Sequence, residues 1–117
     1  MSEDIGIYED DESLVPADMT TYFLGLLKRG PQWSPEETEE TARLQDEHLA
    51  YIRGMFERGE LVIAGPFVDD GNLRGVFLFR TDTLKEAESL AANDPAVIAG
   101  RLIVDIHPWL VPSGVLP

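Results

Sequence analysis

The segment 60–80, ELVIAGPFVDDGNLRGVFLFR, decides the fold of this chain. Residues 60–68 and 73–80 are rich in β-branched and aromatic side chains, and the turn sequence DDGN (69–72) separates them. This pattern predicts a β-hairpin. Because Pro66 has no backbone N–H, the first strand of the hairpin should end at a sheet edge or at a bulge.

A strand and a helix are predicted before the hairpin. Residues 20–29 are predominantly β-forming and predict a first strand. The sequence SPEE (34–37) predicts a helix start, in which the serine caps, the proline takes the first position and the second glutamate completes a capping box. This helix should run to about Arg58, because Gly59 suits its end.

A second helix and strand are predicted after the hairpin. Thr83 and Glu86 form another capping box, followed by a short amphipathic helix. The sequence NDP (93–95) ends that helix, and residues 101–107 predict a fourth strand. We expect the tail, 108–117, to be irregular.

The resulting order, β-α-β-β-α-β, is typical of a ferredoxin-like α+β sandwich. Both helices should cover one face of a four-stranded antiparallel sheet. The strands carry apolar residues in both registers, so the other face also needs a cover. Pairing of two copies face to face is the simplest cover, and we expect a homodimer.

The composition limits the function classes. The chain of 117 residues fits one domain and has no cysteine, which excludes disulfides and thiolate chemistry. No apolar run could cross a membrane and no signal peptide is visible, so we expect a cytoplasmic protein without a membrane partner. The formal net charge of −13 makes nucleic acid an unsuitable partner.

The acidic residues are concentrated at the beginning of the chain. Residues 1–18 hold seven acids and no base. We interpret 1–18 as an acidic N-terminal arm that is dispensable for the fold, and 19–117 as the domain.

His48 stands out within the predicted long helix. It interrupts an apolar face that includes Leu44, Ile52 and Met55. A group that titrates near neutrality is an unusual core residue. Two interpretations are open, a hydrogen-bonded structural histidine or one member of a functional site.

Asp94 is the candidate partner of His48. It ends the second helix, and both helices share one face of the predicted sheet, so the two side chains can meet. The carboxylate would then fix the tautomer of the ring and increase the basicity of the other nitrogen. Asp94 could equally cap the turn that begins at Pro95, and the two roles are compatible.

The ordered blocks of this sequence resemble the YciI-like (YCII-related) proteins. The blocks are His48-Leu49, Ala64-Gly65-Pro66-Phe67, Ala92-Asn93-Asp94-Pro95-Ala96-Val97 and Ala99-Gly100. The resemblance spans about residues 20–109 and implies a dimeric α+β barrel with an active-site His–Asp pair, which maps onto His48 and Asp94. A dehydrochlorinase of chlorinated hydroquinones resembles this family. The acidic arm is additional to the usual domain, and the sequence IHPW (106–109) belongs to one branch at most.

Further residues are candidates for binding a substrate. They are the backbone of Gly65 and Pro66, the cations Arg29 and Arg101, with Arg74 as a third cation, and the rings of His107 and Trp33. Each has a structural alternative: a bulge, a surface cation, an exposed histidine at a strand end, or packing. His48, His107 and Asp105 lack a metal-ligand spacing, so we predict no metal and no cofactor.

These observations predict a small enzyme with His–Asp acid–base chemistry on a small cyclic substrate. Elimination, isomerisation or lactone chemistry suits one base without a nucleophile. The alternatives are a non-catalytic binding or regulatory domain, and an interaction module in which His48 is a core residue.

Overall fold

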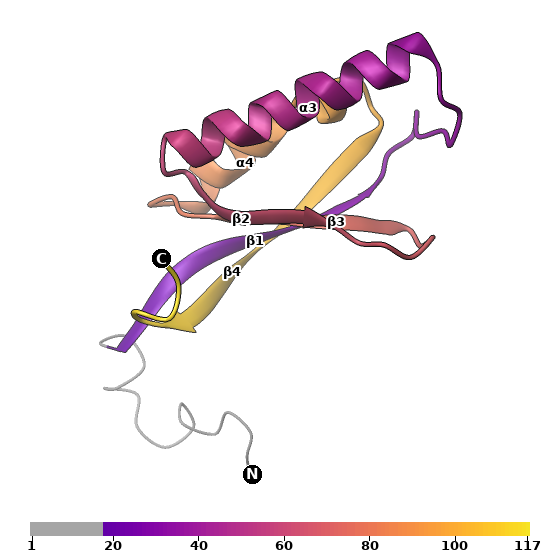
Figure 1. Cartoon of the computed structure of the whole chain (residues 1–117). Helices are drawn as coiled ribbons and strands as arrows, with labels where there is room; N and C mark the ends of the chain where they lie inside the picture. Colours follow the sequence, from indigo (N-terminus) through magenta and orange to yellow (C-terminus); the bar gives the residue numbers. More distant parts are fainter. Residues whose placement is uncertain (1–17) are drawn as a thin grey trace.

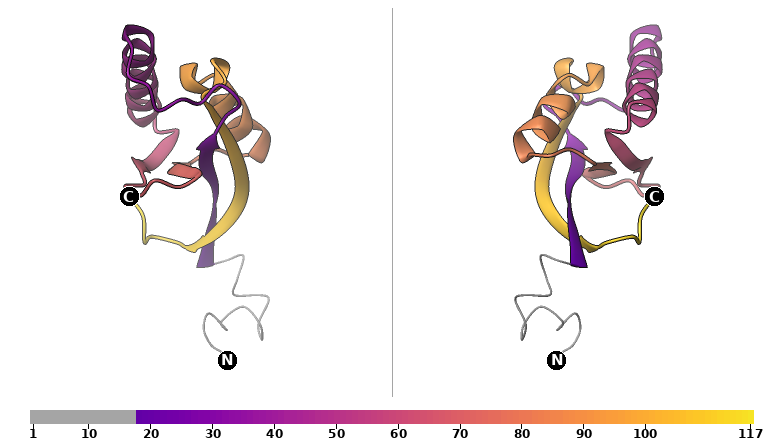
Figure 2. Two further views of the ribbon diagram at one scale, coloured as in Figure 1. Left: turned by 90° about the vertical axis from the view of Figure 1, so that its right-hand side faces the viewer. Right: turned by 90° about the vertical axis from the view of Figure 1, so that its left-hand side faces the viewer.

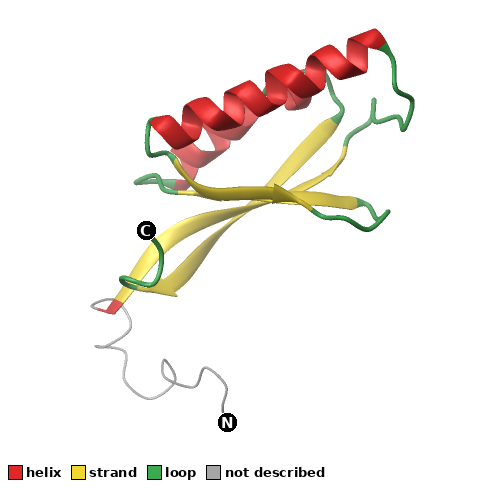
Figure 3. Ribbon diagram, viewed as in Figure 1, coloured by secondary structure: helices red, strands yellow, loops and turns green. Residues whose placement is uncertain are grey.

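The structure is a computed structural model that describes residues 18–117, so the predicted arm lies outside the described residues except for Asp18. The strands form one antiparallel sheet in the order β2-β3-β1-β4. The elements, shown in Figures 1 and 3, are β1 (Met19–Arg29), α3 (Glu39–Glu57), β2 (Leu61–Pro66), β3 (Leu73–Phe79), α4 (Leu84–Ala92), α5 (Pro95–Ile98) and β4 (Leu102–Pro112). The predicted ferredoxin-like α+β fold is confirmed.

Both long helices lie on the same face of the sheet (Figure 2). The core between the two layers contains Phe23 of β1, Phe77 and Phe79 of β3, and Met55 of α3. Phe77 and Phe79 meet edge to face, with ring centroids 5.5 Å apart. Side chains two residues apart on a strand point to the same face of the sheet, so these apolar residues together form the face that packs against the helices.

The hairpin forms as predicted, and β2 is an edge strand of the sheet. Pro66 is the last residue of β2, and within residues 18–117 no strand pairs with the outer side of β2. This agrees with the prediction that a residue without a backbone N–H lies at a sheet edge. Pro66 faces Gly75 across the ladder. A Cβ atom at Gly75 would lie 2.6 Å from the carbonyl oxygen of Gly65, so glycine is required where β2 and β3 approach.

The predicted start of the long helix is wrong by several residues. Thr38, not Ser34, is the N-cap: its side chain accepts from the Thr41 N–H, and the Thr41 hydroxyl accepts from the Thr38 N–H. Ser34 instead accepts from the Glu36 N–H in a local turn. Two cap sequences compete within five residues, and the reciprocal threonine pair defines the helix end. The predicted end is confirmed, with Gly59 at φ +77°.

The prediction of an irregular tail is also wrong for residues 108–112. They continue β4 and pair with β1 as far as Met19 opposite Pro112. Pro108 and Pro112 are tolerated because β4 is the other edge strand of the sheet.

The face without helices carries a second apolar cluster. Tyr22, Leu78 and Val111 are buried there, and Leu116 of the C-terminal segment packs against them. Ile103 and Trp109 of β4 remain about half exposed. The C-terminal segment thus covers only part of this face.

Candidate active site

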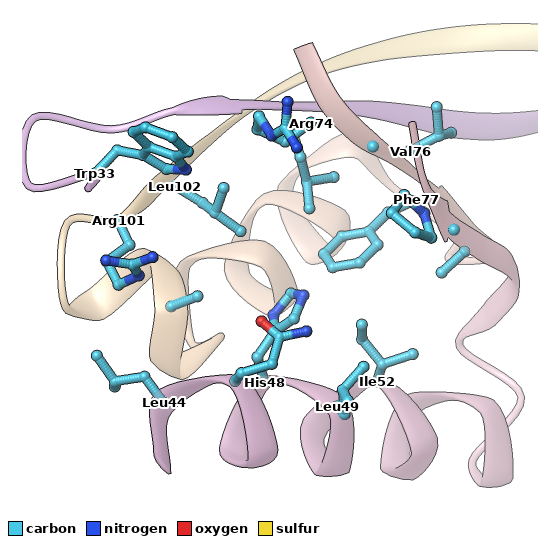
Figure 4. Close-up of a pocket in the computed structure, with 17 residues that line it drawn as sticks. Trp33, Leu44, His48, Leu49, Ile52, Arg74, Val76, Phe77, Arg101 and Leu102 are labelled. Atoms are coloured by element: carbon cyan, nitrogen blue, oxygen red, sulfur yellow. The ribbon is translucent and has the colours of Figure 1, made fainter. Parts of the chain in front are cut away.

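Residue His48 lies in the middle of α3 and is directed toward the sheet (Figure 4). Only His48 and Met55 of this helix are buried. The histidine ring stacks near Phe77 of β3, with ring centroids 6.1 Å apart and an interplanar angle of 28°. The seven-residue spacing places both side chains on the same face of the helix, so His48 is as much part of the interior as the methionine.

Asp94 is fully buried at the junction of α4 and α5. Its Oδ1 accepts from the Ala96 N–H at 2.9 Å, which makes it the N-cap of α5. The Nδ1 atom of His48 lies 2.7 Å from Oδ2 and 2.9 Å from Oδ1 of the same carboxylate. The carboxylate therefore caps a helix and contacts the ring of His48 at the same time.

The partner of Nδ1 determines the tautomer of the neutral ring. An ionised carboxylate can only accept hydrogen bonds, so we expect Nδ1 of the neutral ring to carry the proton and to donate it to Asp94. The Nε2 atom then holds a lone pair. This atom has no hydrogen-bond partner among residues 18–117, and it is not sealed from solvent. The ring presents a proton acceptor to the adjacent pocket.

The pocket lies between α3 and the sheet and has a volume of about 350 Å³. This volume is at the lower end of the range for sites that take small molecules. Its walls are mainly apolar, with a few polar groups that converge on the cavity (Figure 4). The apolar side chains include Leu27, Leu44, Leu49, Ile52, Phe77 and Leu102, and the polar ones are Trp33, Gln45, His48, Arg74 and Arg101.

Five of the residues predicted to bind a substrate line this pocket: Trp33, Gly65, Pro66, Arg74 and Arg101. Gly65 pairs in register with Val76, and the register shift in β2 lies nearer its start, between Leu61 and Ile63. The structural alternative of a bulge at Gly65 is therefore not what the structure shows. Asp94 lies behind His48 and does not form the pocket wall.

Arg29 and His107 are placed elsewhere. The guanidinium of Arg29 stacks on the Trp33 ring at 4.1 Å and pairs with Asp70, so it contacts the pocket only through the tryptophan. His107 alternates with the core-facing residues of β4, which puts it on the sheet face without helices. There its Nε2 lies 3.2 Å from Asp105, and this hydrogen bond, followed by that from Lys28, lowers the Asp105 pKa.

Two residues near the His–Asp pair were not predicted as functional. Gln45 lies one turn before His48 on α3 and lines the pocket, and its interruption of the apolar face was the available signal. The Tyr51 hydroxyl donates to the Leu90 carbonyl at 2.7 Å, tying α3 to α4. Burial raises the Tyr51 pKa, and the negative charge of Asp94 raises it further.

Within residues 18–117, no group of three or more histidine or acidic side chains is arranged to hold a metal ion. His48 and His107 lie on opposite faces of the sheet. No helix in the described part of the chain is long and apolar enough to span a membrane.

Comparisons with known proteins extend this description. The family model of the YCII-related domain matches residues 23–110. The fold is similar to that of 5-chloro-2-hydroxyhydroquinone dehydrochlorinase from Burkholderia phenoliruptrix AC1100, solved with 2,5-dihydroxybenzoquinone, at a TM-score of 0.56 and 23% identity over 75% of this chain and 92% of that chain. At this identity the likeness shows the fold alone. No curated protein matches the sequence.

Proposed function

This chain belongs to the YCII-related domain family, and from that premise we propose that it is an enzyme of His–Asp acid–base chemistry on a small cyclic substrate. His48 is the general base and acid, and Asp94 orients it. The observation that carries the proposal is the pair of contacts, 2.7 and 2.9 Å, between Nδ1 of a pocket-lining histidine and a fully buried carboxylate.

The composition of the pocket favours proton transfer over nucleophilic catalysis. Among the described residues that line it, there is no serine, threonine, cysteine, lysine or carboxylate. The Nε2 atom of His48 is thus the basic atom that faces the cavity. A base of this kind, oriented by an acceptor on its other nitrogen, typically accelerates a reaction by about 10²–10⁴-fold.

Elimination is the reaction that we favour among those open to one base. Nε2 takes a proton from the substrate, the freed electron pair forms a double bond, and the leaving group departs with its own pair. The Asp94 carboxylate stabilises the imidazolium that forms. The similar fold of a dehydrochlorinase, an enzyme that removes HCl, supports this choice.

The test is chloride release from 5-chloro-2-hydroxyhydroquinone, followed for the full chain and two matched variants. His48→Gln should lower the rate by at least about 10²-fold. The control, His107→Gln, changes the chain's other histidine, which lies on the opposite sheet face and does not line the pocket. Equal rates for the full chain and His48→Gln would contradict the proposal, and binding without turnover would favour a non-catalytic domain.

We also propose that two copies pair through the sheet faces without helices. Ile103 and Trp109 are about half exposed there, beside the buried cluster of Tyr22, Leu78 and Val111. An apolar sheet face of this kind is stabilised by a second layer. A homodimer supplies this layer without altering the pocket, which lies on the other face.

A further inference from the structure

The charged side chains that line the pocket have the opposite sign to the net charge of the whole protein. Acidic residues make up 22 of the 117 residues, and the formal net charge is −13. None of the 17 residues that line the pocket is acidic, whereas two are arginines and one is His48. The cavity is therefore a local cationic site in a strongly anionic chain.

The two arginines are held by backbone carbonyls and not by carboxylates. Arg101 donates to the Ser34 carbonyl at 3.1 Å. One nitrogen of Arg74 donates to the carbonyls of Asp69 and Gly71, at 3.2 and 2.9 Å. Within residues 18–117, neither arginine forms an ion pair with a carboxylate.

Three other arginines form ion pairs with carboxylates, whereas Arg53 and Arg80, like the two pocket arginines, form none within residues 18–117. Arg29 pairs with Asp70 at 2.9 Å, Arg58 with Glu60 at 2.9 Å, and Arg43 with Glu47 at 3.9 Å. A backbone carbonyl fixes the direction of a guanidinium but leaves its charge uncompensated. Arg74 and Arg101 are thus oriented cations with N–H groups left for a further acceptor.

We propose that the ligand of this pocket is a small organic anion whose charged group, a carboxylate or an equivalent pair of oxygens, is bound by Arg101 and Arg74. The planar guanidinium matches two oxygens of such a group, and a hydrogen bond between two charged partners is stronger than a neutral one. The mostly apolar walls lower the local polarity and strengthen this attraction.

The arrangement gives the pocket two ends (Figure 4). Trp33 and Arg101 lie at one end, Phe77 and Ile52 at the other, and His48 lies on α3 between them. Arg74 lies on the sheet side of the cavity, between Trp33 and Phe77 in this view, so an anion between Arg101 and Arg74 would extend its ring or chain past His48 toward Phe77. The inference rests on the proposed function in placing the ligand beside His48, and it adds the charge that the ligand carries.

The test compares two probes of nearly the same shape, benzoate and benzamide, by isothermal titration calorimetry of the full chain. Benzoate carries the charge that the arginines should recognise, and benzamide does not. We expect benzoate to bind at least about tenfold more tightly, since hydrogen bonds between charged groups account for such a ratio. Raising the salt concentration should reduce the difference.

Variants identify the groups responsible. Arg101→Gln and Arg74→Gln should each weaken benzoate binding by about tenfold and leave benzamide binding within about twofold. Arg43→Gln removes the same charge from the exposed side of α3, where Arg43 pairs with Glu47, and should change neither probe. Arg101→Lys, which keeps the charge, should retain part of the preference for benzoate.

Equal affinity for the two probes in the unmodified protein, or binding of neither, would overturn the inference without any variant. It would also be overturned if Arg101→Gln and Arg74→Gln both behaved like Arg43→Gln. The readout is binding, so failure of the proposed function is separate. If the full chain preferred benzoate but His48→Gln kept its turnover, the catalytic proposal would be contradicted and the inference about the anion would stand.

Discussion

The Nδ1 atom of His48 lies within hydrogen-bond distance of both carboxylate oxygens of Asp94, 46 residues away in the sequence. The same carboxylate accepts the Ala96 N–H at the start of α5. The ring orientation and the path of the chain after α4 thus depend on one buried side chain. Stability and site geometry are coupled at this position.

Replacing Asp94 separates its two contributions. Asp94→Ala removes the cap and leaves the His48 N–H buried without an acceptor, and we expect it to lower the free energy of unfolding by about 2–4 kcal/mol. Asp94→Asn keeps an oxygen that can cap α5 and accept from His48. The free energy of unfolding should therefore decrease by less than half as much as in Asp94→Ala. Urea unfolding of both variants measures this, and equal losses would show that the neutral amide cannot replace the carboxylate as cap and acceptor.

Tyr51→Phe tests the link between α3 and α4. Removing the hydroxyl that donates to the Leu90 carbonyl should lower the free energy of unfolding by about 1 kcal/mol. Tyr22→Phe is the control, because the Tyr22 hydroxyl forms no hydrogen bond with another group of residues 18–117, although its ring is buried. A larger effect at Tyr22 than at Tyr51 would contradict this assignment.

The raised Tyr51 pKa also predicts a dependence on pH. Because the folded state favours the neutral phenol, this stabilisation is full below the unfolded tyrosine pKa of about 10 and is lost as the pH rises through the higher folded value. Between neutral and strongly alkaline pH, the midpoint temperature of thermal unfolding should fall more steeply for the unmodified chain than for Tyr51→Phe. Parallel curves would show that Tyr51 does not contribute.

The second sheet face predicts the oligomeric state. Light scattering should give a dimer for the full chain and a monomer for Ile103→Glu, since a carboxylate buried between two sheets is unfavourable. Ile98→Glu is the matched control, because Ile98 is 69% exposed on α5, on the helix-covered side. A monomeric full chain at micromolar concentration, or an unaltered dimer for Ile103→Glu, would exclude this interface.

The acidic arm is predicted to be dispensable. A chain beginning at Met19 loses one described contact of the arm, the Ser113 N–H to the Asp18 carbonyl, which contributes on the order of 1 kcal/mol. It should therefore unfold at nearly the same urea concentration as the full chain. Aggregation or a much lower midpoint would show that the arm is structural.

Much of the fold could be predicted from local rules. The DDGN turn, the missing donor of Pro66 and the Thr83–Glu86 capping box each specify one element boundary, and the structure contains all three. The start of α3 could not be predicted because two cap sequences lie close together. The length of β4 was missed because prolines exclude a residue from a central strand, and only the tertiary structure shows that β4 is an edge.

The site could be predicted only in part. Asp94 and His48 follow from helix order, because both helices share one sheet face. Strand alternation separates His107 from Leu102, Val104 and Ile106, yet alternation alone does not say which set faces the helices. The stacking of Arg29 on Trp33 and its pairing with Asp70 depend on the end of β1 meeting two separate loops, which periodicity does not encode.

The position of the ring proton of His48 tests the central claim most directly. Nitrogen-15 NMR of the full chain, at a pH where the ring is neutral, distinguishes a protonated from an unprotonated ring nitrogen. We predict a proton on Nδ1, donated to Asp94, and a bare Nε2 facing the pocket. A proton on Nε2 would contradict the account, because the nitrogen that faces the substrate would then have no lone pair with which to accept a proton.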